Sequence, residues 1–257
     1  VDLFSFSAGV LIQTQTLPAM ALVLCVYLSA AALNFGLQPM RRRVTMVPLT
    51  WQSVRWGTFW RANQRLWRDP LGGVSLYVTT LYWGVGAVMQ FAVLVWAQQT
   101  LALPLKTGAY LQALVAVGVI LGAFLAGRSF KLHSARQSLP WGLLLAVLLP
   151  VMVLVTEVWL AIPLLLCVGV AGGMLLVPMN ALLQHRGMQV LSSGRSIAVQ
   201  GFNENAGMLL MLAVYAGATA LHLQLSTLVL GFGVLVTVGM VLVCVAYRGQ
   251  WMPARLA

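Results

Sequence analysis

Long apolar runs dominate this sequence, and they constrain its fold more than any other feature. Seven of them can be delimited, at residues 17–37, 74–97, 108–127, 140–156, 158–180, 196–220 and 225–247. A helix needs about 20 apolar residues to cross a bilayer, so each run predicts a transmembrane helix. With 61% hydrophobic and 7% charged residues, the chain is expected to be an all-α polytopic membrane protein.

The basic residues gather on one side of these predicted helices. The chain has 15 Lys and Arg against 4 Asp and Glu, a net charge of +11, which in a soluble protein would suggest a nucleic-acid partner. All of the basic residues except Lys106 fall in connections after the first, third, fifth and seventh runs. The positive-inside rule makes that side cytoplasmic, with the C-terminus inside, and no nucleic-acid partner is expected.

The spacing of the runs predicts two unequal parts. Residues 1–40 carry one helix, the end of a truncated N-terminal bundle, and residues 41–72 form a long basic cytoplasmic loop. Residues 73–248 form a complete six-helix bundle, followed by a cytoplasmic tail at 249–257. Two six-helix halves are a common transporter plan. Because the chain starts at Val1 with no signal-peptide pattern, we expect an upstream portion to be missing.

The long loop contains an amphipathic segment at residues 54–68. If this segment is helical, its apolar and basic side chains separate onto two faces. The first face has Trp56, Phe59, Trp60, Leu66 and Trp67, and the second has Arg61, Arg65 and Arg68. The pattern predicts a helix in the inner membrane interface. It either connects the two bundles or makes a specific lipid or partner contact.

Polar residues divide the runs into two kinds. The first, fourth and seventh runs are nearly featureless, whereas the second, third, fifth and sixth carry hydroxyl, amide and carboxyl groups. Such groups usually face a bundle interior or an aqueous cavity, so these four helices are predicted to line the cavity. Gly118 with Gly122 and Gly169 with Gly173 predict close helix packing. Pro178 is expected to bend or end the fifth run.

The sixth run carries the densest polar segment, QGFNEN at residues 200–205. Gln200, Asn203 and Glu204 share one helix face, and Glu204 lies about 13 Å beyond Arg195, near the predicted midplane. Glu204 is either a transport-site residue or part of a hydrogen-bonded knot between helices. The candidate substrate-binding residues are Glu204, Asn203, Gln200, Asn205, Asn180, Gln90 and Gln112.

The remaining reactive residues predict neither a metal site nor a catalytic one. Cys25, Cys167 and Cys244 are isolated within apolar runs, and the three histidines lie in predicted loops or at a helix end. Neither HExxH nor GxSxG occurs, which argues against a membrane enzyme such as an acyltransferase. No cofactor and no catalytic residue are expected.

Four segments carry a resemblance to a known family. They are LYWGVGAVMQFAVLVW (81–96), LQALVAVGVILGA (111–123), GGMLLVPMNALLQHRG (172–187) and SIAVQGFNENAGMLLMLAVY (196–215). From about Trp51 to the end of the last run, the chain resembles the bacterial lysophospholipid transporters of the major facilitator superfamily. The resemblance implies the fold of that superfamily, represented by its sixth helix and its C-terminal six-helix bundle. In that fold, every third helix stands outside the central cavity.

The resemblance also implies a function. Such a protein moves lysophosphatidylethanolamine and lysophosphatidylglycerol from the outer to the inner leaflet of the bacterial inner membrane, where a partner acyltransferase restores the missing acyl chain. Glu204 would be the acidic cavity residue of the eleventh helix, within a charge pair that gates access. Where enterobacterial relatives carry an Arg, this chain has Gln90, which cannot supply the opposite charge. A proton-coupled drug or solute exporter, with Glu204 as its titrating group, is the alternative.

Overall fold

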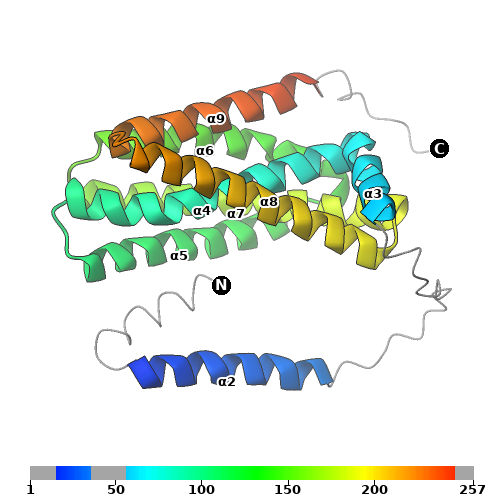
Figure 1. Ribbon diagram of the computed structural model, residues 1–257, viewed down its shortest axis with the longest axis horizontal. Helices are drawn as coiled ribbons and strands as arrows, with labels where there is room; N and C mark the ends of the chain where they lie inside the picture. Colours follow the sequence, from blue (N-terminus) through cyan, green and yellow to red (C-terminus); the bar gives the residue numbers. More distant parts are fainter. Residues whose placement is uncertain (1–15, 36–55, 247–257) are drawn as a thin grey trace.

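The computed structural model describes residues 16–35 and 56–246, and in them it contains helices and no strand (Figure 1). The helices are α2 (Thr16–Phe35), α3 (Trp56–Arg68), α4 (Pro70–Gln99), α5 (Leu105–Ser129), η2 (Leu132–Ser138), α6 (Leu139–Val151), η3 (Met152–Leu154), α7 (Val158–Val190), α8 (Ser193–Ala220) and α9 (Leu225–Ala246). The all-helical expectation is confirmed for these residues. Predictions for the basic residues at 41–43 and 55, and for the C-terminal tail, lie outside them.

Within residues 16–35 and 56–246, five segments are long and apolar enough to cross a membrane. They are α4, α5, the stretch Leu132–Leu154 that contains α6, then α7 and α9. α2 contributes only a shorter apolar stretch, Met20–Leu33. α8 has 28 residues, but the polar groups between Gln200 and Asn205 interrupt its apolar character. The chain is therefore a multi-pass membrane protein, whereas the predicted spans at 17–37 and 196–220 stay predictions.

The helices form one bundle, in which α6 packs against α7 and α9 packs against α4. α6 and α9 lie against each other along one side of the bundle, the upper side in Figure 1. α4 contacts α5, α7 and α8, and α5 packs along α7. α2 is set apart from the bundle in the same view. The four helices that carry the polar residues thus form a connected group with α4 at its centre.

Glycines allow α5 and α7 to approach each other closely. A Cβ atom at Gly122 would meet the carbonyl oxygen of Val170, and a Cβ atom at Gly118 would lie 2.9 Å from the Cα of Gly169. Small residues spaced four apart let helix backbones come into contact within a membrane. The predicted close packing of these two helices is confirmed.

α7 continues past the proline that was expected to bend or end it. The helix runs to Val190, with Pro178 in its interior, beyond the predicted end at residue 180. A proline removes one backbone hydrogen bond, but Met174 and Met179 on either side are buried in the bundle, and this packing sustains the helix. The prediction of a helix end was wrong. As a consequence, His185 and Arg186 lie in the last turns of α7 and not in a loop.

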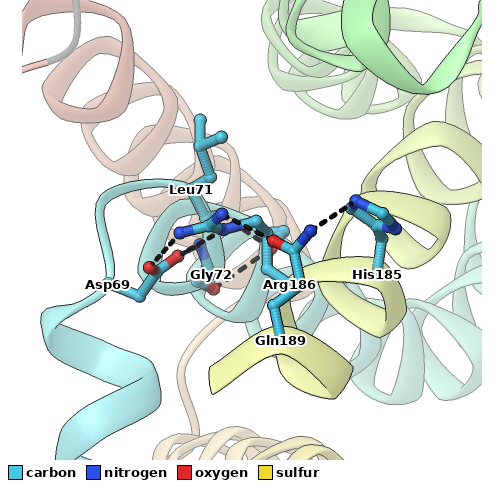
Figure 2. Close-up of polar contacts among 7 residues, drawn as sticks. Asp69, Leu71, Gly72, His185, Arg186 and Gln189 are labelled. Atoms are coloured by element: carbon cyan, nitrogen blue, oxygen red, sulfur yellow. Dashed lines mark hydrogen bonds and ion pairs between the residues drawn. The ribbon is translucent and has the colours of Figure 1, made fainter. Parts of the chain in front are cut away.

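An ion pair joins the beginning of α4 to the end of α7 (Figure 2). Asp69 is the N-cap of α4, and its Oδ2 accepts a hydrogen bond from the Gly72 amide at 2.7 Å. The Arg186 guanidinium binds both carboxylate oxygens, with Nη2 2.5 Å from Oδ1 and Nε 3.0 Å from Oδ2. Gln189 accepts a further hydrogen bond from Arg186 Nη1 at 2.7 Å. This bidentate geometry fixes the two helix ends relative to each other.

The surroundings of Asp69 shift its acidity. Burial by itself raises the pKa of this carboxyl group, because it disfavours the charged form. The hydrogen bonds from Arg186 and from the Gly72 amide, together with the charge of Arg186, act in the opposite direction and outweigh burial. The pKa of Asp69 therefore lies below its ordinary value.

Candidate substrate site

Three of the candidate polar residues meet between α7 and α8. The side-chain amide of Gln200 donates one hydrogen bond to Asn180 Oδ1 at 3.0 Å and another to Glu204 Oε1 at 2.9 Å. Gln200 and Glu204 are one turn apart on α8, and Asn180 comes from α7. All three side chains are half-buried. We refer to them below as the Asn180–Gln200–Glu204 cluster.

α4 brings a hydroxyl group next to this cluster. Thr79, which is fully buried, lies beside Glu204, and its hydroxyl donates a hydrogen bond to the Leu76 carbonyl of its own helix at 3.2 Å. α4 and α8 come close together nearby, since a Cβ atom at Gly84 would lie 3.0 Å from the carbonyl oxygen of Gly207. Thr79 is visible in the sequence as a hydroxyl in an apolar run, but nothing in the sequence places it beside Glu204.

Asn203 faces a different helix. Its amide nitrogen donates to Asn63 Oδ1 at 2.8 Å and to the Val199 carbonyl at 2.7 Å, and its Oδ1 accepts from Trp67 Nε1 at 3.0 Å. Both Asn63 and Trp67 belong to α3. Asn203 is therefore occupied by contacts with α3 and with its own helix, and it does not join the cluster formed by its neighbour Glu204.

This contact follows from the packing of α3, since one side of this helix is buried against the bundle. Ala62, Asn63 and Leu66 are buried, and Leu66 lies in a small apolar cluster with Val199 of α8. Trp56 and Trp60 remain exposed, at 79% and 52%. The aromatic residues that were expected on one face of α3 are thus divided between the bundle and the exterior. Asn63, which was not among the candidate residues, is the buried polar residue of α3.

The other candidates lie outside the cluster. Asn205 is exposed, and its amide donates to the Gly201 carbonyl of its own helix at 2.7 Å. Gln112 of α5 donates its side-chain amide to the backbone carbonyl of Gln90 in α4. Gln90 and Gln112 line a cavity in the bundle that the cluster residues do not line. The seven candidates therefore separate into distinct polar groups.

The cluster presents a carboxylate and amides within an otherwise apolar bundle. Among the described residues the ion pair that forms is the one between Asp69 and Arg186, and Glu204 is not part of it. The hydrogen bond from Gln200 partly compensates the cost of holding a carboxyl group away from water. Glu204 can therefore accept a hydrogen bond from a hydroxyl group, or form an ion pair with a cationic group, that enters the site.

Curated proteins related to this chain share most of its length. The lysophospholipid transporter LplT of Serratia proteamaculans is 35% identical over 219 residues, which are 82% of this chain and 53% of that protein. LplT of Shigella flexneri is 34% identical over 233 residues, with 90% of this chain and 58% of that protein. LplT of an Enterobacter species is 33% identical over 258 residues, with 98% and 62%.

The chain is homologous to the lysophospholipid transporters. It spans between 53% and 62% of the length of these three relatives. No family model matches the chain, and no solved structure matches it. The resemblance predicted from the sequence is confirmed by these relatives, which are named as transporters.

Proposed function

We propose that this chain is the C-terminal part of a transporter of the major facilitator superfamily that moves lysophospholipids across the bacterial inner membrane. The observation that carries this proposal is the identity of 33–35% with proteins named lysophospholipid transporters. The substrates would be lysophosphatidylethanolamine and lysophosphatidylglycerol, carried from the outer to the inner leaflet by alternating access. The basic loops and the C-terminus would then face the cytoplasm.

The Asn180–Gln200–Glu204 cluster supports this proposal as a place for the headgroup. Glu204 lacks an ion-pair partner among the described residues, so the ammonium group of an ethanolamine headgroup can supply the missing charge. The side-chain nitrogen of Asn180 can still donate a hydrogen bond to a phosphate oxygen, and the side-chain oxygen of Gln200 can still accept one from a hydroxyl group. The cluster therefore suits a polar head attached to an apolar chain.

An acyltransferase is the partner that this function requires. Lysophospholipid delivered to the inner leaflet lacks one acyl chain, and an acylglycerophosphoethanolamine acyltransferase would restore it there. The two activities would together return a lysophospholipid to the bilayer as a diacyl lipid.

Uptake of labelled lysophosphatidylethanolamine tests the proposal. Spheroplasts that lack their own transporter should take up the lipid when they express the complete protein, and Glu204→Ala should reduce that uptake by at least about tenfold, the equivalent of losing one charged hydrogen bond. Glu204→Gln, which keeps the shape and an acceptor oxygen, separates the need for charge from the need for a hydrogen bond. Normal uptake by Glu204→Ala at equal protein levels would contradict the role of Glu204.

A proton-coupled drug or solute exporter is the alternative, and one observation favours it. Glu204 is a half-buried carboxyl group held by neutral partners, which is the setting of a group that takes up and releases a proton. A drug-resistance phenotype that follows the transmembrane pH gradient, without any lysophospholipid uptake, would support the exporter and refute the lipid transporter.

A further inference from the structure

A cavity of about 360 Å³ penetrates the helix bundle. Its walls come from all six helices between α4 and α9, and they are aliphatic or aromatic except for a few polar groups. Those groups belong to Tyr82, Trp83, Gln90 and Gln112. Of all the lining residues, only Gly86 and Gln90 are exposed. The cavity therefore opens on the face of α4 that carries these two residues.

The cavity begins close to the Asn180–Gln200–Glu204 cluster. Met208, which lines it, lies one turn beyond Glu204 on α8, roughly 6 Å along the helix axis. On α4 the lining starts at Val78, beside Thr79, and continues to Val93, roughly 22 Å along the axis. The cluster thus lies at one end of a largely apolar space that extends toward the far end of α4, where Gln90 and Gln112 contribute amide groups to the wall.

We propose that this cavity holds the acyl chain of a single-chain lipid whose headgroup lies at the Asn180–Gln200–Glu204 cluster. The proposal rests on the lipid-transport function and adds to it the site that selects chain length. Apart from Tyr82, Trp83, Gln90 and Gln112, the walls offer no side-chain hydrogen-bond partners, so a sugar or an ion would lose most of its hydration there with little compensation. An alkyl chain gains free energy with each methylene that it buries.

Two glycines on α4 have different surroundings: Gly84 packs against another helix, whereas Gly86 faces open space. A Cβ atom at Gly84 would meet Met211 at 2.9 Å and the Gly207 carbonyl at 3.0 Å, so this glycine serves helix packing. A Cβ atom at Gly86 meets nothing within 4 Å, although Gly86 lines the cavity. A larger side chain at Gly86 can therefore enter the opening of the cavity without disturbing the helices.

The first experiment narrows the opening in the complete protein. Spheroplasts are offered lysophosphatidylethanolamines that differ only in acyl-chain length, with Gly86→Leu compared to the unmodified protein. We expect Gly86→Leu to lower uptake of the longest chain about tenfold relative to the shortest, as if roughly two methylenes lost their burial. Gly231→Leu on α9, where a Cβ atom also meets nothing within 4 Å and which does not line the cavity, should leave the ratio unchanged.

A second experiment does not depend on any variant. A lysophosphatidylethanolamine with a photoreactive group at the end of its acyl chain is crosslinked to the unmodified protein, and the labelled peptides are identified. We expect label on lining residues far from the cluster, such as Leu149 and Met152. Excess unlabelled lysophospholipid should prevent the labelling, whereas a diacyl phospholipid should not.

The outcomes separate this inference from the function on which it rests. Complete absence of lysophospholipid uptake by the unmodified protein refutes the proposed function and, with it, the acyl-chain site. Normal uptake with an unchanged chain-length ratio in Gly86→Leu refutes the acyl-chain site alone. Label confined to outward-facing residues such as Leu242 refutes it as well, even if Gly86→Leu fails to fold.

Discussion

The indole N–H of Trp67 donates a hydrogen bond to the side-chain oxygen of Asn203 at 3.0 Å, and this bond attaches α3 to α8 immediately beside Glu204. The rings of Phe59 and Phe202 reinforce the same junction, with an edge-to-face contact at 5.1 Å between centroids. A helix of the basic connection therefore holds the segment of α8 that carries the candidate carboxylate.

Replacing Trp67 with Phe tests the contribution of this bond. Trp67→Phe keeps an aromatic ring but removes the donor, so Asn203 Oδ1 loses its partner from α3. We expect a loss of about 1 kcal/mol in the free energy of unfolding, measured as a lower melting temperature of the purified protein. Trp60→Phe, an exposed indole on the same helix, is the control and should melt like the unmodified protein. Equal melting temperatures for both variants would contradict the junction.

The ion pair between Asp69 and Arg186 predicts a larger effect. Asp69→Asn removes the charge while keeping an oxygen near the Gly72 amide, and it leaves Arg186, 29% exposed, without its carboxylate. We expect this change to cost about 1.5–3 kcal/mol, toward the lower value because solvent reaches the guanidinium. Arg186→Lys keeps the charge but cannot bind both oxygens, so thermal unfolding should give it an intermediate stability.

The same pair predicts a pH dependence. Because the pKa of folded Asp69 lies below its ordinary value of 3.8, the stabilisation is complete above that value and is lost as the pH falls through the folded pKa. The unmodified protein should therefore lose part of its extra stability over Asp69→Asn when the pH falls below the ordinary pKa of 3.8. Melting temperatures of the two proteins, measured from neutral pH downward, should converge, and a constant difference would count against the assignment.

The sequence predicted helices better than it predicted their ends or their contacts. Runs of apolar residues located the helices because length and polarity are local properties. Pro178 was predicted to bend or end its helix, and the predicted end was wrong, since the buried residues around it belong to the tertiary packing of α7. The end of a helix depends on what packs against it, which a local pattern does not contain.

In the candidate site, too, the local sequence pattern predicted some contacts and the packing between helices decided the others. Spacing along one helix predicted that Gln200 and Glu204 share a face, and they are hydrogen-bonded to each other. Asn203 shares that spacing but turns to Asn63 and Trp67, which lie more than 130 positions earlier in the chain. Periodicity reports which side of a helix a residue is on, and only the packed structure reports which helix it meets.

The close contact of α5 and α7 predicts that Gly122 tolerates no side chain. A Cβ atom there would collide with the backbone of Val170, so Gly122→Leu must force the two helices apart, at a cost of about 3 kcal/mol or more. Gly127, near the end of the same helix, has nothing within 4 Å of its Cβ position. Gly127→Leu is the matched control, and the amount of folded protein in the membrane should fall for Gly122→Leu alone.

The bridging position of Gln200 predicts a pH-sensitive variant. Its amide donates both to Asn180 and to Glu204, whereas a carboxylate in its place could donate to neither and would lie beside another carboxylate. Gln200→Glu should therefore destabilise the protein by about 1–3 kcal/mol at neutral pH. Two carboxylates this close cannot both stay charged, and a protonated one regains a donor. We expect the loss in melting temperature to shrink as the pH is lowered. Gln184→Glu, at an exposed position on α7, should show no such recovery, and a loss in Gln200→Glu that is the same at every pH would exclude the bridging role.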